Sequence, residues 1–170
     1  AEKGTFADTM IVTDSWFKDF SGYGIALNSE NDDRGRYNAE YITVSRCTFV
    51  DMMGSAIDIY RGGNDESTLG PFVTINECDF INICNRELGT AVRMIGVQWS
   101  RIGDCRFVDS GKSGRAVWFE DPAWADIEIR DLRLSNSGRI QTFYPRRVDR
   151  ASLDYSDITV DRTQLKEWTL

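Results

Sequence analysis

The chain has 170 residues with 20 Lys or Arg against 27 Asp or Glu, which gives a formal net charge of −7. It contains no His, and this excludes a Ser-His-Asp triad, a Cys-His nucleophile pair and an imidazole metal site. The length suits one domain, so we expect a single domain over residues 1–170. The acidic balance argues against nucleic acid as a partner, because non-specific binding needs Lys and Arg to displace counterions. No stretch approaches the roughly 18 apolar residues of a membrane helix, so a membrane is not an expected partner.

Internal repeats organise the sequence. A large apolar residue recurs every 27 to 32 residues, at Phe17, Phe49, Phe80, Phe107 and Leu134. Each one follows a stretch in which apolar and polar residues alternate, at residues 10–12, 41–44, 72–75, 97–102 and 125–129. A second apolar position follows each landmark, at Ile25, Ile57, Val92, Val117 and Ile140. The alternation has a period of two, which predicts strands rather than helices.

Short strands in repeating units of this length predict an all-β fold, a right-handed parallel β-helix of about five to six rungs. A leucine-rich repeat needs more Leu, and a β-sandwich needs hairpin turns such as Asn-Gly, which the sequence lacks. Equivalent positions of a β-helix stack about 4.7–4.9 Å apart. The four aligned Phe residues should therefore form an internal aromatic ladder.

Three of the four cysteines occupy one aligned position, two residues before the landmark: Cys47, Cys78 and Cys105. Free Cys is usually buried, so we interpret them as a stack of small, reduced side chains. A disulfide between rungs is the alternative, which we disfavour because parallel stacked side chains aim poorly at one another. Cys84 lies outside this column, in a turn.

Two insertions, over residues 28–38 and 61–71, leave the repeat at the same point and should project from one face, where repeat proteins often bind ligands. The strands beside them present two outward columns. One column contains Asp58, Arg93, Trp118 and Gln141, and the next contains Tyr60, Ile95, Glu120 and Phe143. Aromatic rings cover sugar faces and Arg binds carboxylates bidentately. The candidate substrate-binding residues are Tyr60, Arg61, Asn64, Glu66, Arg93 and Trp118; the alternative is an ordinary mixture of exposed strand side chains.

Two acidic runs, at residues 31–33 and 64–66, carry the oxygen ligands that Ca²⁺ prefers, but neither has the EF-hand spacing. Acidic runs in loops are usually solvated. We therefore expect no metal site and no cofactor in this chain.

The run from Asp58 to Thr68, followed by Gly70-Pro71, resembles the C-terminal β-helical domain of polysaccharide lyase family 6, the alginate lyases related to chondroitinase B. The resemblance extends over residues 10–160. It implies the C-terminal part or a subunit of a larger, periplasmic or secreted lyase that cleaves uronate polymers by β-elimination. No signal-peptide pattern is visible at residues 1–4.

The family's catalytic β-helix, by the same resemblance, binds Ca²⁺ and carries a Lys base and an Arg acid. The four Lys residues here, Lys3, Lys18, Lys112 and Lys166, lack that context, so we assign no catalytic residue. We expect an accessory, non-catalytic domain that packs beside a catalytic β-helix domain or chain and helps shape the cleft for an anionic uronate polysaccharide. The alternatives are a stand-alone uronate-binding module, a solenoid that only presents an assembly surface, and an autonomous site at Tyr60, Arg61 and Arg93.

A β-helix exposes an open rung at each end unless it is capped. No amphipathic helical pattern precedes residues 10–12, whereas residues 164–170 could form a short cap. We therefore expect the N-terminal rung to suit docking to a preceding domain or a separate chain.

Overall fold

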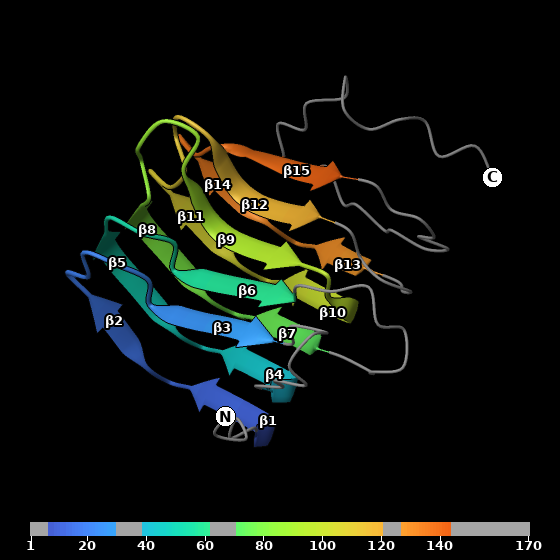
Figure 1. Cartoon of the computed structure of the whole chain (residues 1–170). Helices are drawn as coiled ribbons and strands as arrows, with labels where there is room; N and C mark the ends of the chain where they lie inside the picture. The colour runs from blue at the N-terminus through green and yellow to red at the C-terminus, as the bar shows by residue number, and fades with distance from the viewer. Residues whose placement is uncertain (1–6, 30–38, 62–70, 121–126, 144–170) are drawn as a thin grey trace, which may run out of the picture.

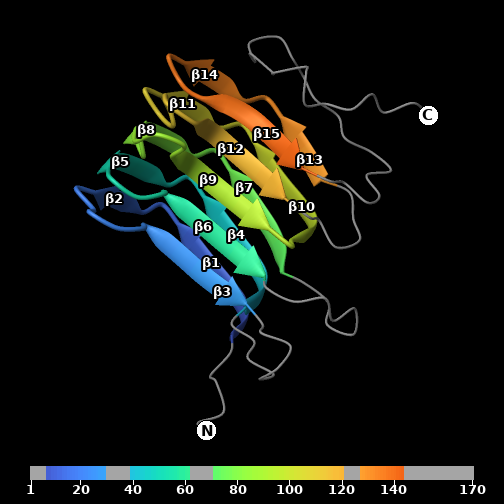
Figure 2. The same ribbon diagram turned by 45° about the horizontal axis from the view of Figure 1, so that its top comes forward.

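Three parallel β-sheets surround one core in the computed structural model, which describes residues 7–29, 39–61, 71–120 and 127–143. These residues form fifteen strands and no helix (Figures 1 and 2). Sheet A contains β1 (Ala7–Thr13), β4 (Ala39–Ser45), β7 (Phe72–Asn76), β10 (Gln98–Gly103) and β13 (Ile127–Arg130). Sheet B contains β2 (Trp16–Lys18), β5 (Thr48–Met52), β8 (Asp79–Ile83), β11 (Arg106–Val108) and β14 (Arg133–Ser135). Sheet C contains β3 (Ile25–Ser29), β6 (Ile57–Arg61), β9 (Thr90–Ile95), β12 (Arg115–Glu120) and β15 (Arg139–Phe143).

Consecutive strands lie in different sheets, and each strand pairs in parallel with the strand three places along the chain. We call β1–β2–β3, and each later group of three, a strand triplet. The fold is therefore all-β and a parallel β-solenoid, as the repeats predicted. The predicted alignment of the landmarks is also confirmed, because successive landmarks from residue 17 to residue 134 are register partners in sheet B.

The landmark aromatics stack inside the solenoid. The ring centroids of Phe17 and Phe49 lie 4.7 Å apart, those of Phe49 and Phe80 5.2 Å, and those of Phe80 and Phe107 4.6 Å, with interplanar angles of 9°, 8° and 15°. These spacings lie close to the separation of neighbouring strands, about 4.7–4.9 Å, so the backbone ladder sets the distance between rings. Three of the rings are fully buried, and Phe17, at the end of the ladder, is partly buried.

The cysteines are reduced and buried, as predicted, with no disulfide among the four. Cys47, Cys78 and Cys105 each donate an S–H hydrogen bond to the backbone carbonyl two residues earlier, at sulfur–oxygen distances of 3.3, 3.2 and 3.0 Å. Burial raises the pKa of the Cys47 thiol. The hydrogen bond between Cys78 and Cys105 lowers the pKa of the Cys78 thiol and raises that of Cys105. All three thiols are at most 1% exposed, so the column packs the core and is not accessible as a nucleophile.

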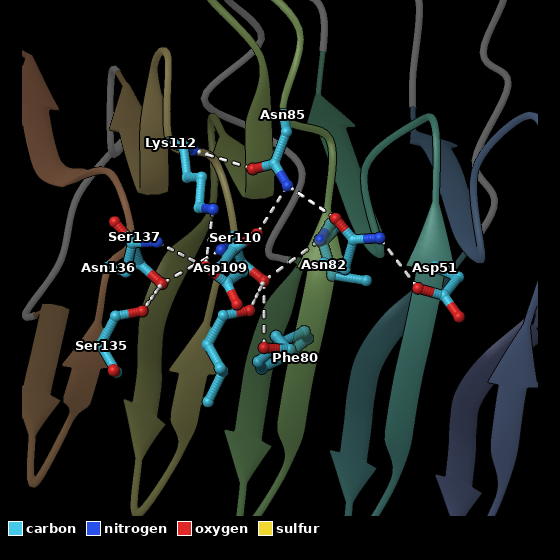
Figure 3. Close-up of polar contacts among 12 residues, drawn as sticks. Asp51, Phe80, Asn82, Asn85, Asp109, Ser110, Lys112, Ser135, Asn136 and Ser137 are labelled. Atoms are coloured by element: carbon cyan, nitrogen blue, oxygen red, sulfur yellow. Dashed lines mark hydrogen bonds and ion pairs between the residues drawn. The ribbon is translucent and has the colours of Figure 1, made fainter.

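The chain turns out of sheet B at residues in the left-handed conformation, which Asn and Asp tolerate better than most residues. Figure 3 shows the side chains at these turns linked along the solenoid. The Asn82 amide donates to Asp51 at 2.8 Å, and the Asn136 amide donates to Asp109 at 2.6 Å. The Lys112 ammonium lies 2.6 Å from the same Asp109 carboxylate. Successive turns are therefore held together by polar contacts on the outside as well as by rings on the inside.

Two carboxylates at turns, those of Asp14 and Asp109, should make the free energy of unfolding depend on pH in the acidic range. The hydrogen bond from Arg46 lowers the pKa of Asp14, and those from Lys112 and Asn136 lower the pKa of Asp109. A depressed folded-state pKa contributes stability that is present above the unfolded value, about 3.9 for Asp, and is lost as the pH falls through the folded value. We therefore expect the melting temperature to fall below about pH 4, and the fall to be shallower in an Asp14→Asn, Asp109→Asn double variant. Thermal denaturation followed by circular dichroism at a series of pH values would measure this; identical slopes for both proteins would contradict it.

Candidate functional site

The outer face of sheet C carries the two predicted columns in the predicted register. Asp58 pairs with Arg93, Arg93 with Trp118, and Trp118 with Gln141. In the second column residue 60 pairs with 95, residue 95 with 120, and residue 120 with 143. The intervening residues of these strands, such as those at 57, 59, 92 and 94, point inward and are fully buried. Alternation along each strand therefore assigns one set of side chains to the core and the other to this face.

An ion pair occupies one end of the first column. The Nε atom of Arg93 lies 2.8 Å from Oδ1 of Asp58, and the two side chains are 31% and 8% exposed. The expectation that this column consists of exposed side chains is therefore wrong for Asp58 and for Gln141, which is also buried. Arg93 covers the carboxylate from the solvent side, so part of its hydrogen-bonding capacity serves the fold. A guanidinium has five N–H donors, more than this one bond uses.

A residue that sequence reasoning did not single out organises the other end of the column. The guanidinium carbon of Arg115 lies 4.2 Å from the centroid of the Trp118 ring, a cation–π contact. Its Nε donates to Oε1 of Gln141, and one of its terminal nitrogens donates to the Leu88 carbonyl at 3.3 Å. Arg139 donates to the same Gln141 oxygen at 3.4 Å. The neutral Gln141 amide thus accepts hydrogen bonds from two guanidinium groups, and one of them lies on the Trp118 ring.

The face brings three guanidinium groups onto neighbouring strands: Arg93 on β9, Arg115 on β12 and Arg139 on β15. All three side chains are half-buried. Tyr60, on β6, is 41% exposed at the edge of the same face. In register, Arg115 pairs with Arg139, whereas Arg93 pairs with Trp118, the ring on which Arg115 lies. We call these three arginines, which surround Trp118 and Gln141, the arginine row. Such a row, with aromatic surface beside it, can bind a chain of sugar rings that bear carboxylates.

The remaining predicted residues fall at or beyond the limits of the described structure. Arg61 is the last residue of β6, but its side chain, together with Asn64 and Glu66, lies outside the described residues. The same holds for most of the two predicted insertions. Their flanking strands are described: β3 and β6 end, and β4 and β7 begin, at the same edge of the solenoid (Figure 2). Both connections therefore leave from the edge between sheets C and A, whereas Arg115 and Arg139 begin their strands at the opposite edge of sheet C.

A second aromatic stack lies on the outer face of sheet A, and the sequence reasoning missed it. The rings of Tyr41 and Phe72 lie 4.9 Å apart at 14°, and those of Phe72 and Trp99 lie 5.3 Å apart at 1°. Tyr41 and Trp99 are 49% and 52% exposed. Trp99 has a φ of 36°, and the register of β10 shifts between Gln98 and Arg101, which marks a β-bulge. Phe72 is covered on both ring faces, whereas Tyr41 and Trp99, at the two ends of the stack, are each covered by a ring on one face only.

The described part of the chain offers no assembled catalytic centre of the lyase type. Lys112 lies in a turn and is paired with Asp109, and Lys18 ends β2 in sheet B, so neither reaches the face of sheet C. Among the described residues, no group of three or more Cys, Asp or Glu side chains is arranged to hold a metal ion. Nor do those segments include a helix long and apolar enough to cross a membrane.

No protein-family model matches the chain, and no curated protein sequence matches it significantly. The functional proposal below therefore rests on the geometry of the outer face of sheet C and on the resemblance found in the sequence.

Proposed function

We propose that the chain is a right-handed parallel β-helix of about five to six rungs that binds an anionic uronate polysaccharide, as an accessory domain of a larger alginate-type lyase. Right-handed winding follows from the near-universal handedness of connections between parallel strands of one sheet. The observation that carries the binding proposal is the row of guanidinium groups from Arg93 through Arg115 to Arg139, with Trp118 and Tyr60 beside it. By the family resemblance, we expect the catalytic partner to hold the Ca²⁺ and the protein to act in the periplasm or outside the cell.

The charge distribution supports an anionic ligand at this face rather than over the whole surface. The chain carries a net charge of −7, so a polyuronate is repelled at long range. Screening largely removes that repulsion beyond about 8 Å at physiological salt, whereas a guanidinium in contact with a carboxylate is screened less. Binding should therefore be local to the arginine row. It should also weaken as salt is added, because the contacts are ionic.

The face of sheet C supplies only one of the two groups that β-elimination requires. Elimination needs a cation to neutralise the uronate carboxylate and a base to remove the neighbouring proton. The arginines can provide the first function, while the described Lys residues lie elsewhere. We therefore assign binding and positioning to this chain and place the base in a partner β-helix. An autonomous site with Tyr60 as base remains the alternative that an activity assay decides.

Titrating the protein with alginate oligosaccharides, while recording Trp fluorescence and binding heat, tests the proposal. We expect saturable binding that weakens with salt. An Arg115→Gln variant should lose about tenfold in affinity, since a hydrogen bond to a charged group contributes about 1.5–3 kcal/mol. Arg133→Gln, an exposed position on β14 of sheet B, removes the same charge from another face and should bind as the parent does.

Three outcomes would contradict the proposal or part of it. Absence of both heat and fluorescence change would remove the polysaccharide ligand and favour a purely structural solenoid. Equal losses in the Arg115 and Arg133 variants would show that general charge, rather than this face, causes binding. Growth of absorbance from unsaturated product during the titration would show that the chain is itself a lyase, which overturns the accessory assignment.

A further inference from the structure

The outer face of sheet A carries buried polar atoms that have no hydrogen-bond partner in the described structure. They are Oδ1 of Asn76, Nε of Arg101 and Nε of Arg130. The three residues lie on the neighbouring strands β7, β10 and β13 (Figure 1). A buried polar atom without a partner costs free energy, so a group of them on one face needs a physical explanation.

Described chain surrounds this part of sheet A. Asn76, Gly103 and Arg130 are the last residues of β7, β10 and β13, and the connections from these strands to sheet B are all described. The side chain of Arg130 crosses Gly103, since a Cβ atom at residue 103 would lie 3.3 Å from Cγ of Arg130 and 3.5 Å from Oδ1 of Asn76. Asn76 and Arg130 therefore approach each other over Gly103, yet no hydrogen bond joins them.

Arg101 is a cation that the fold leaves without an ion pair. Its register partner on β13 is Glu128, but that carboxylate pairs with Arg130, whose Nε lies 3.4 Å from it. Among the described residues, the half-buried Arg101 side chain forms neither a hydrogen bond nor an ion pair. Because no such contact holds the guanidinium, its N–H donors can turn toward a ligand that arrives from the solvent.

An exposed tryptophan lies on the same strand and on the same face as Arg101. Ser100, between the two, is buried, so Trp99 and Arg101 both point outward, with Cα atoms about 6–7 Å apart along β10. Trp99 has its φ of 36° at the bulge, which is unfavourable for a bulky residue. Bulges re-aim side chains beside active sites, and backbone strain concentrates at functional sites. The strained backbone holds the indole ring on Phe72 and beside Arg101, with the other ring face outside the stack.

A sugar that carries a carboxylate matches these groups better than a protein surface does. Its ring hydrogens form an apolar face that can pack on an indole, and its carboxylate can accept two parallel N–H bonds from a guanidinium. In register, the row of Arg101 continues on β7 and β4 as the hydroxyl-bearing Thr74 and Thr43. A protein interface would instead need a core of apolar side chains with few charges. The acidic residues Glu77 and Asp104 follow the ends of β7 and β10, so the carboxylate of the sugar should lie at Arg101 rather than at this turn.

We propose that the outer face of sheet A is a second carbohydrate site, at which Arg101 binds the carboxylate of a uronate sugar and Trp99 packs against the sugar ring. Arg130, whose side chain is 41% exposed, can move off Gly103 and let a hydroxyl of the ligand reach Oδ1 of Asn76. The inference rests on the proposed function only for the class of ligand. It shares no residue with the arginine row, which lies on sheet C, so each site can fail alone.

Two tryptophan signals report the two faces separately in one titration. In proton–nitrogen NMR correlation spectra of the full chain, Trp99→Phe and Trp118→Phe identify the indole N–H signal of each residue. An alginate tetrasaccharide should shift the Trp99 signal to saturation. Arg101→Gln should raise the Kd that Trp99 reports by about tenfold, the effect of losing a hydrogen bond to a charged group, and leave the Kd at Trp118 unchanged. The matched control, Arg133→Gln, removes the same charge from sheet B and should leave both Kd values unchanged.

A neutral probe and further variants complete the test. Cellotetraose offers similar ring faces without a carboxylate, so its Kd at Trp99 should be about tenfold higher than that of the alginate tetrasaccharide. Arg101→Lys, which keeps the charge but not the bidentate fork, should lie between the parent and Arg101→Gln. Arg115→Gln should weaken the response of Trp118 and leave that of Trp99 unchanged. Since Arg101 has no side-chain partner among the described residues, both Arg101 variants should keep the parent's melting temperature.

The response of Trp99 decides the inference. A Trp99 signal that stays in place would overturn it, and so would an equal Kd for the parent and Arg101→Gln or for the two oligosaccharides. An equal loss at Trp99 and Trp118 in Arg115→Gln would also overturn it, because Trp99 would then only report binding at sheet C. A Trp118 signal that stays in place while Trp99 responds would instead overturn the arginine row and support the site on sheet A.

Discussion

Replacing Phe80 by Ala should lower the free energy of unfolding by about 3–5 kcal/mol, the range for removing a buried aromatic ring. Phe80 is fully buried, and its ring is covered on both faces by Phe49 and Phe107 at 5.2 and 4.6 Å. The rings on either side are held by the backbone ladder, so they cannot move together to fill the space. The loss should therefore include a cavity contribution as well as the lost transfer energy. Urea denaturation followed by circular dichroism would measure it.

Phe17→Ala is the matched control for this prediction. Phe17 stacks on Phe49 at 4.7 Å on one side, but it is the last ring of the ladder and is only partly buried. Solvent can enter the space that its removal leaves, so its loss should be clearly smaller than that of Phe80. Equal losses at the two positions would contradict the description of residue 17 as the uncovered end of the ladder.

The Phe80→Ala substitution should also weaken the coupling between the two halves of the solenoid. In a repeat architecture each unit contacts only its neighbours, so stability depends on the interfaces between adjacent units. Loss of the ring between Phe49 and Phe107 weakens two of these interfaces at once. Hydrogen exchange should then show a larger difference between the opening free energies of the first and last triplets than in the parent protein.

The register of the solenoid was predictable from the sequence because one residue type repeats at one structural position. Phe at the landmark position fixes sheet B, and the alternating residues on either side then fix sheets A and C. The two outward columns of sheet C followed from the same alignment, without any contact being known. Patterns with a period of two and a fixed repeat thus carry enough information to place strands and to assign side chains to a face.

Which outward residues are accessible could not be predicted in the same way. Asp58 and Gln141 point away from the core and are nevertheless buried, since long Arg side chains from neighbouring strands reach over the sheet. The role of Arg115 depends on an oxygen 26 residues later in the chain. Alternation along a strand predicts the direction of a side chain, but it does not predict whether a neighbouring side chain covers it.

The aromatic stack on sheet A shows a different limit. Trp99 joins Tyr41 and Phe72 through a bulge in β10, where the regular spacing of the repeat fails. An alignment that assumes regular strands moves such a residue to the wrong face. A positive φ at a Trp is also unfavourable for the local chain, so no local propensity predicts it.

Arg93→Ala should lower the free energy of unfolding by about 2–3 kcal/mol, more than the loss of an ordinary surface charge. The Asp58 carboxylate is 8% exposed and lies 2.8 Å from Nε of Arg93. Removing one partner of a buried ion pair costs about 3–5 kcal/mol, because the other charge stays buried and uncompensated. Arg93 is 31% exposed, and water can replace part of its contact, so we expect the smaller figure. Urea denaturation at neutral pH measures the change.

A double substitution separates the structural role of Arg93 from its proposed role in binding. Asp58→Asn with Arg93→Gln removes both charges and keeps an amide at each position, so most of the lost stability should return. Polyuronate affinity should not return, because the guanidinium is gone. Asp58→Asn alone should have the opposite effect and bind polyuronate several-fold more tightly, since the carboxylate that competes for Arg93 is replaced by a neutral amide. If Asp58→Asn left affinity unchanged and the double variant bound as the parent does, Arg93 would serve the fold alone, and the binding row would be reduced to Arg115 and Arg139.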